Sequence, residues 1–142
     1  MIVLDTNVLS ELMKPTPSAR VLAWAQKQSA SELFTTAITE AEIFYGIEML
    51  GKGKRREGLL AAAQAMFTED FRGRIFGFES DAARDFSRIA ADRRVLGKPI
   101  SHADAQIAAI TRVHGAKLAT RNVRDFADCE ILDVIDPWNV NR

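Results

Sequence analysis

The first four residues, Met1-Ile2-Val3-Leu4, form an unbroken apolar run that ends at Asp5, Thr6 and Asn7. A short continuous apolar run suits a strand covered on both faces, as in a parallel sheet. Open α/β sheets bind their ligands beyond the carboxyl ends of the strands, where Asp5 falls. The three polar residues are also common helix-capping types, so Asp5 is either a functional acid or the cap of a following helix.

Strand-like and helix-like segments alternate along the rest of the chain. Further strands are expected at residues 33–36, 74–78, 117–120 and 130–133, with helical periodicity between them. This alternation predicts an α/β fold with a parallel sheet of about five strands flanked by helices. At 142 residues, with no repeat or linker, the chain is expected to be one domain over residues 1–142.

Composition excludes several classes of protein. The chain has 19 Lys plus Arg and 19 Asp plus Glu, so any contact with nucleic acid must come from local patches such as the basic turn at residues 51–56. We interpret that turn first as a solvated loop. The N-terminal apolar run is too short for a signal peptide or a membrane span, and a single cysteine, Cys129, fits a reducing cytoplasm. With only His102 and His114, a Cys/His zinc site is not expected.

Two further acids stand near predicted helix starts. Glu42 and Asp104 each lie three residues after a hydroxyl residue, Thr39 and Ser101, which is also the spacing of a helix-capping box. The helix stripe of Asp104 is largely apolar, through Ile107, Ala108 and Thr111, and that of Glu42 through Tyr45, Gly46 and Met49. An ionised acid in an apolar setting needs a partner, which favours a functional interpretation over simple capping.

Helix starts gather along the carboxyl edge of a parallel sheet, so we expect Asp5, Glu42 and Asp104 to converge there. Clustered carboxylates repel one another unless a cation neutralises them. Mg²⁺ or Mn²⁺, which prefer oxygen ligands, would suit such a cluster and would support metal-assisted phosphodiester hydrolysis.

The segment after the strand at residues 117–120 should reach the same edge. Thr120 and Asn122 could hold water or orient a carboxylate, and Asp125 could be a further ligand. Arg121 and Arg124 could meet a phosphate, although a solvated turn is the first interpretation for both arginines.

At this point the sequence resembles the PIN-domain ribonucleases, specifically the VapC or FitB-like toxins of type II toxin–antitoxin pairs. The resemblance is carried, in the family's order, by residues 2–7, 39–46, 100–109 and 119–126. Each segment alone is a weak signal, but the ordered set is specific.

The resemblance implies a Rossmann-like fold and an endoribonuclease pocket of three or four acids that holds Mg²⁺ or Mn²⁺. Asp5, Glu42 and Asp104 match the acidic positions; Asp5 and Asp104 are the expected metal ligands, with Glu42 acting directly or through water. The fourth acidic position aligns with Asn122, a neutral amide, which leaves open whether Asp125 compensates and whether one or two ions bind.

Further expectations from the resemblance concern substrate positioning and partners. Thr6 and Thr120 match hydroxyl positions that orient water or substrate. The family implies a homodimer and a cognate antitoxin that blocks the acidic pocket. The resulting hetero-oligomer would bind operator DNA only through the antitoxin, with no membrane involved. The RNA that is cleaved does not follow from the residues.

Three other functions compete with a metal-dependent ribonuclease. Asn122 favours a catalytically weak module that binds RNA or antitoxin and contributes to operator-bound regulation. A phosphorylatable receiver domain would need paired acids after the first strand, where only Asp5 stands. A haloacid-dehalogenase-type phosphatase would need an acid at the position of Asn7.

Overall fold

Five short parallel strands form the centre of the molecule in the computed structural model, which describes residues 1–140. Their order is β3-β2-β1-β4-β5, so the N-terminal strand lies in the middle and is paired on both sides. This confirms the predicted α/β class with a five-stranded parallel sheet. The strands are β1 (Ile2–Leu4), β2 (Leu33–Thr36), β3 (Ile75–Phe76), β4 (Lys117–Ala119) and β5 (Val134–Ile135).

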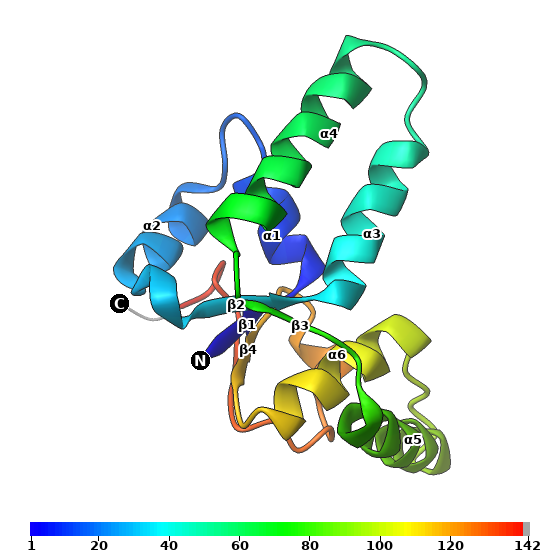
Figure 1. Cartoon of the computed structure of the whole chain (residues 1–142). Coiled ribbons are helices and arrows are strands. Elements are labelled where there is room, and N and C mark those ends of the chain that lie inside the picture. The colour runs from blue at the N-terminus through cyan, green and yellow to red at the C-terminus, as the bar shows by residue number, and fades with distance from the viewer. Residues whose placement is uncertain (141–142) are drawn as a thin grey trace.

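Helices cover both faces of the sheet, with α1 to α4 on one side and α5 and α6 on the other (Figure 1). None of the helices within residues 1–140 is long and apolar enough to span a membrane. The α-helices are α1 (Thr6–Leu12), α2 (Ala19–Lys27), α3 (Ala37–Glu48), α4 (Lys54–Ala65), α5 (Ser80–Val95) and α6 (His102–Val113). Three short turns of other helix types are η1 (Ala30–Glu32), η2 (Met66–Asp70) and η3 (Val123–Phe126).

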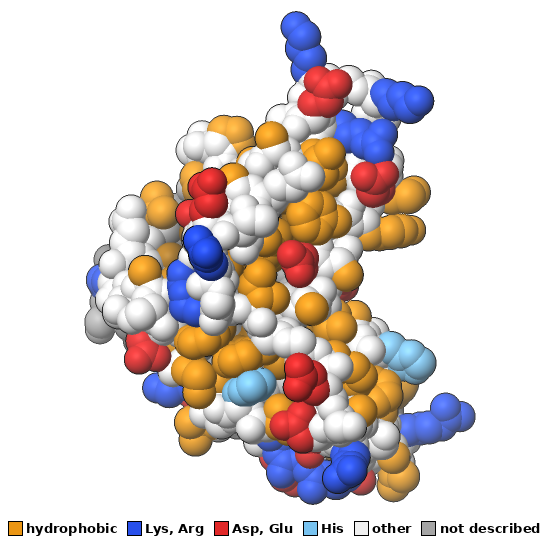
Figure 2. All heavy atoms as spheres, viewed as in Figure 1, with side chains coloured by type: hydrophobic (Ala, Val, Ile, Leu, Met, Phe, Trp, Pro, Cys, Tyr) orange, Lys and Arg blue, Asp and Glu red, His pale blue; other side chains and the backbone are white. Residues whose placement is uncertain are grey.

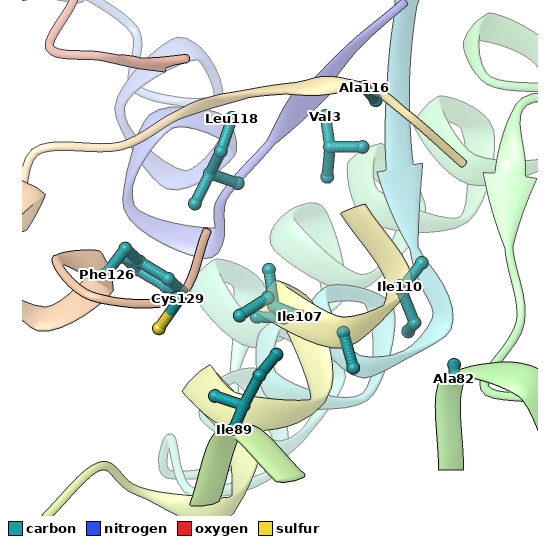
Figure 3. Close-up of a cluster of buried hydrophobic side chains, with 11 residues drawn as sticks. Val3, Ala82, Ile89, Ile107, Ile110, Ala116, Leu118, Phe126 and Cys129 are labelled. Atoms are coloured by element: carbon teal, nitrogen blue, oxygen red, sulfur yellow. The ribbon is translucent and has the colours of Figure 1, made fainter. Parts of the chain in front are cut away.

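Alternate residues of the central strands face opposite cores, because successive side chains of a strand point to opposite faces. Val3 and Leu118 pack with Ile107 and Ile110 of α6 (Figure 3). Leu4 packs into the second cluster, beneath α1 to α4. Full burial of each such side chain contributes about 1.5–3 kcal/mol. Packing on both faces therefore fixes β1, and with it the position of Asp5 at its carboxyl end.

The helices α3 and α4 form a hairpin that extends away from the sheet (Figure 1). The basic segment at residues 51–56 lies at the tip, where basic side chains stand out into solvent (Figure 2). Lys54 begins α4, and the Arg56 guanidinium pairs with the Glu48 carboxylate at 2.5 Å. The segment is a solvated helix start, in agreement with the first interpretation of the sequence.

The last strand lies later in the chain than the sequence pattern predicts. It runs over Val134–Ile135 and not over residues 130–133. Asp128 and Glu130 adopt left-handed backbone angles, with φ of 62° and 55°, so the chain turns where a strand was expected. Leu132 is 72% exposed and contributes little to the core. The apolar pattern of residues 130–133 was therefore misleading.

Candidate active site

Asp5 lies at the carboxyl end of β1 and is 3% exposed. One carboxylate oxygen, Oδ1, accepts from the Thr6 backbone N–H at 2.8 Å. The other, Oδ2, accepts from Thr120 Oγ1 at 2.7 Å and from Asn7 Nδ2 at 3.2 Å. Burial raises the pKa of Asp5, since desolvation outweighs these hydrogen bonds and the Glu42 carboxylate adds repulsion. Asp5 both caps α1 and faces the site, so the two interpretations of this residue are compatible.

Glu42 lies on α3 but does not take part in a capping box. The N-cap of α3 is Thr36, whose Oγ1 accepts from the Thr39 N–H at 3.1 Å, so the helix starts earlier than predicted. The hydroxyl oxygen of Thr39 instead lies 3.0 Å from that of Thr6. The Thr6 hydroxyl also lies 2.6 Å from Glu42 Oε1, to which it donates.

The surroundings of Glu42 also differ from the prediction. Glu42 is exposed, and its stripe neighbours Tyr45 and Met49 are 67% and 68% exposed. The apolar setting expected for Glu42 is therefore an open surface. What holds Glu42 near the sheet edge is the hydroxyl of Thr6 and not burial.

Asp104 lies in the first turn of α6, where the Ser101 hydroxyl accepts from its backbone N–H at 3.1 Å. Ile107, Ala108 and Thr111 are buried, which confirms the predicted apolar stripe. The Asp104 side chain is half-buried. Desolvation, together with the Asp5, Asp125 and Glu42 carboxylates, raises the pKa of Asp104 to about 6, against a smaller opposing effect of the Ser101 hydrogen bond.

The three acids line one pocket of about 450 Å³ at the carboxyl edge of the sheet. The predicted convergence of Asp5, Glu42 and Asp104 is therefore seen in the structure. The other lining residues are Thr6, Asn7, Ser10, Glu11, Lys14, Arg121, Asn122 and Trp138.

The segment after β4 contributes unequally to this pocket. Thr120 is fully buried beneath Asp5, and its Oγ1 also accepts from the Asn122 N–H at 3.0 Å. Asn122 and Arg121 line the pocket. Asp125 lies on the other side of Asp104, in a smaller recess shared with Arg93. Arg124 is exposed and lines neither space, so the expected phosphate contact of Arg124 gains no support from its position.

The pocket carries negative charge that the described residues leave unpaired. None of Asp5, Glu42 and Asp104 forms an ion pair with any residue of 1–140. The two cations that line the pocket contact other lining residues and not these three acids, because Lys14 pairs with Glu11 at 2.9 Å and Arg121 lies over the ring of Trp138. The carboxylates therefore repel one another, and binding of a cation would relieve that repulsion.

The donor set suits a hard divalent cation in its chemistry, since carboxylate oxygens are the ligands that Mg²⁺ and Mn²⁺ prefer. Within residues 1–140, no three His, Cys, Asp or Glu side chains are arranged to hold a metal ion as they stand. Glu42 accepts a hydrogen bond from Thr6 that a direct bond from Glu42 to a metal would have to compete with, which leaves Asp5 and Asp104 as the other two carboxylate donors of the pocket. A bound ion would thus complete its coordination with water or after a small movement of Glu42.

The raised pKa of Asp104 predicts that this residue destabilises the metal-free protein near neutral pH. The folded protein holds the Asp104 proton up to about pH 6, whereas the unfolded chain releases it near 3.8, so stability falls as pH rises through this window. Without metal, we expect Asp104→Asn to melt roughly 2–5 °C above the wild type at pH 7, with the difference vanishing near pH 4. Asp92→Asn, an exposed acid on α5, is the control. A pH-independent difference would contradict this origin.

Three residues that line the pocket or lie beneath it were not predicted to build the site. Asn7 orients Asp5 and accepts from the Arg121 N–H at 3.1 Å; its place two residues after Asp5 was a usable signal. Thr39 was mistaken for a cap, and no sequence signal marks its contact with Thr6. Trp138 follows β5, and the misplaced fifth strand concealed its proximity to the sheet edge.

Comparison with known proteins agrees with this geometry. The PIN domain family profile matches residues 2–131. The chain is 40% identical over 138 residues to VapC ribonuclease Y4jK of Sinorhizobium fredii, covering 97% of this chain and 98% of that protein. It is 34% identical to toxin FitB of Neisseria gonorrhoeae, covering 98% and 99%. A structure of FitAB bound to an IR36 DNA fragment superposes with a TM-score of 0.92 at 34% identity, over 100% of this chain and 99% of that one. The chain therefore belongs to the PIN-domain family, together with the VapC and FitB toxins.

Proposed function

We propose that the protein is a metal-dependent endoribonuclease and the toxin of a toxin–antitoxin pair. The observation that carries this proposal is the convergence of Asp5, Glu42 and Asp104 in one pocket without a described cationic partner. The relative that is 40% identical over almost the whole chain is named as a ribonuclease, which supports the same activity here. Because the proposed substrate is RNA, we also propose that the protein acts in the cytoplasm.

In this proposal the protein residues have distinct tasks. Asp5 and Asp104 hold Mg²⁺ or Mn²⁺, and Glu42 does so directly or through water. The ion supplies charge stabilisation at the phosphate and activation of water. Thr120 and Asn7 keep the Asp5 carboxylate in place through their hydrogen bonds to Oδ2.

Other pocket residues would position the reactants. Thr6 and Asn122, which line the same pocket as Asp5, orient water or substrate, and Arg121 adds positive charge there. Asp125 lines the adjoining recess with Asp104 and not the pocket that Asp5 lines, so in this proposal it acts on the site only through the negative charge that it adds beside Asp104. Attack of water on phosphorus, with departure of the 3′-oxygen, gives a 5′-phosphate and a 3′-hydroxyl.

We also propose a cognate antitoxin as the principal partner. The FitAB structure is a complex of related proteins on DNA, which supports a hetero-oligomer here and contact with operator DNA through the antitoxin. A homodimer of this chain is part of the same proposal. An antitoxin that blocks the pocket would place a basic side chain against the unpaired acids.

A second candidate function is a catalytically weak module that binds RNA or antitoxin. Asn122 favours it, because a neutral amide occupies the pocket position that the family resemblance assigns to a fourth acid. Such a module would bind RNA whether or not divalent metal is present.

Removal of metal separates the two functions. Purified protein, free of antitoxin, should cleave a panel of structured and single-stranded RNAs with Mg²⁺ or Mn²⁺, lose cleavage in EDTA and regain it when the ion is restored. Products should carry 5′-phosphate and 3′-hydroxyl ends, read by labelling and mass spectrometry. Binding without cleavage under all conditions would favour the second candidate. Cleavage in EDTA, or 2′,3′-cyclic phosphate ends, would contradict the proposed mechanism.

A further inference from the structure

Trp138 occupies a fixed position at the rim of the acidic pocket. It lies in a turn just after β5, where its N–H donates to Asp136 Oδ1 at 2.9 Å and its carbonyl accepts from Arg20 at 3.3 Å. One part of the side chain packs against the core cluster beneath α1 to α4, while another part lines the pocket. The ring is therefore held in place without being fully covered.

Arg121 lies over the Trp138 ring, with its guanidinium carbon 4.8 Å from the ring centroid. The side chain is exposed, and within residues 1–140 it forms no ion pair. Its backbone N–H donates to Asn7, which itself contacts Asp5. Hydrogen bonds through Asn7 thus connect the Arg121–Trp138 pair to Asp5, one of the proposed metal ligands.

We propose that the Arg121–Trp138 pair is a docking site for a nucleobase of single-stranded RNA beside the scissile phosphate. This inference rests on the proposed ribonuclease function and adds a substrate contact to it. Unpaired bases stack on aromatic rings and on guanidinium planes, and proteins that bind single-stranded RNA combine these stacks with positive charge. The pair offers both chemistries next to Asp5, Asn122 and the rest of the pocket.

A contact between Arg121 and phosphate alone would not need the tryptophan. A phosphate recognises positive charge and N–H donors, neither of which an indole ring face supplies. The other residues that line the pocket are polar, so a base would stack on the part of the Trp138 ring that Arg121 and the core leave open, or on the Arg121 guanidinium itself. A phosphate-only role for Arg121 is the competing outcome of the test below.

Tryptophan fluorescence can report on the pair directly. The chain contains two tryptophans, and Trp24 is 7% exposed in the core, so Trp24→Phe leaves Trp138 as the only indole. Combining it with Asp104→Asn prevents cleavage during titration, and circular dichroism checks the fold. A short single-stranded RNA should quench Trp138 fluorescence, whereas an abasic ribose-phosphate oligomer of the same length should not. The RNA should also bind about 5- to 100-fold more tightly than the abasic oligomer.

Variants of Trp138 in the otherwise wild-type protein give a second measurement. Trp138→Leu should raise KM for single-stranded RNA about tenfold with kcat changed less than about threefold, whereas Trp138→Phe, which keeps a smaller aromatic face, should raise KM less than Trp138→Leu does. Equal binding of RNA and abasic oligomer without quenching, or an unchanged KM in Trp138→Leu, would overturn the inference. Base-dependent quenching by a wild-type protein that cuts no RNA would instead refute the ribonuclease proposal alone.

Discussion

Replacing Asp104 with asparagine is expected to reduce RNA cleavage at least about a hundredfold while the protein remains folded. The substitution keeps the shape of the side chain but removes one of the carboxylate charges proposed to hold the ion. Catalytic metal sites contribute several kcal/mol to transition-state stabilisation, and each 1.36 kcal/mol is a factor of ten in rate. Single-turnover cleavage at saturating Mg²⁺ is the measurement.

A matched control distinguishes loss of the site from a general change in charge. Asp92→Asn removes an exposed acid from α5, outside the lining of the acidic pocket, and should cleave at the wild-type rate. Divalent cation should raise the melting temperature of the wild type and of Asp92→Asn, but much less that of Asp104→Asn. A folded Asp104→Asn protein that cut RNA as fast as wild type would remove Asp104 from the site.

Asp5→Asn should be as inactive as Asp104→Asn but is a less clean test. The Asp5 carboxylate accepts three hydrogen bonds and caps α1. An asparagine there would point its amide NH₂ group at either the Thr120 hydroxyl or the Thr6 backbone N–H, each of which donates to Asp5 in the wild type. Loss of activity would then mix chemistry with local disruption. Asp104 accepts no hydrogen bond from the core of the sheet, which makes its neutralisation easier to interpret.

The sequence predicted the sheet and the gathering of acids because both follow from strong local signals. The apolar run before Asp5 and the strand at residues 33–36 are short, continuous and bounded by polar residues, and the structure has them where expected. Parallel topology then brings the helix starts to one edge without any further information. The convergence of Asp5 with Asp104 needed no knowledge of side-chain contacts.

The features that the sequence did not reveal depend on tertiary contacts. Thr36 and Thr39 are both plausible caps, and only the length of β2 and the contact of Thr39 with Thr6 decide between them. The apolar residues Ile131 and Leu132 led to a predicted position for the last strand that is too early in the chain. The left-handed backbone at Glu130, which ends this possibility, cannot be read from residue type. The exposure of Glu42 likewise depends on which face α3 turns toward α1.

Arg93 shows how a residue outside the pocket can support it. It is 5% exposed on α5 and donates to the carbonyls of Lys98 at 2.8 Å, Asp125 at 2.7 Å and Ala127 at 2.9 Å. These contacts join α5 to the segment that follows β4, on which Asn122 and Asp125 are carried. A guanidinium carries its N–H groups on separate nitrogen atoms, so Nε can donate to Lys98 while Nη1 donates to Asp125 and Ala127.

We therefore expect Arg93→Ala to lower the free energy of unfolding by about 2–3 kcal/mol, because three partly buried carbonyls lose a charged donor and its packing is lost. Urea unfolding followed by circular dichroism measures the change. Arg94→Ala removes the same side chain from the exposed neighbouring position and should stay within about 0.5 kcal/mol of wild type. Arg93→Lys should recover only part of the loss, since one ammonium group cannot reach all three carbonyls. Equal stability of the two alanine variants would mean that water replaces Arg93 without cost, and that the loop bearing Asn122 is held by other contacts.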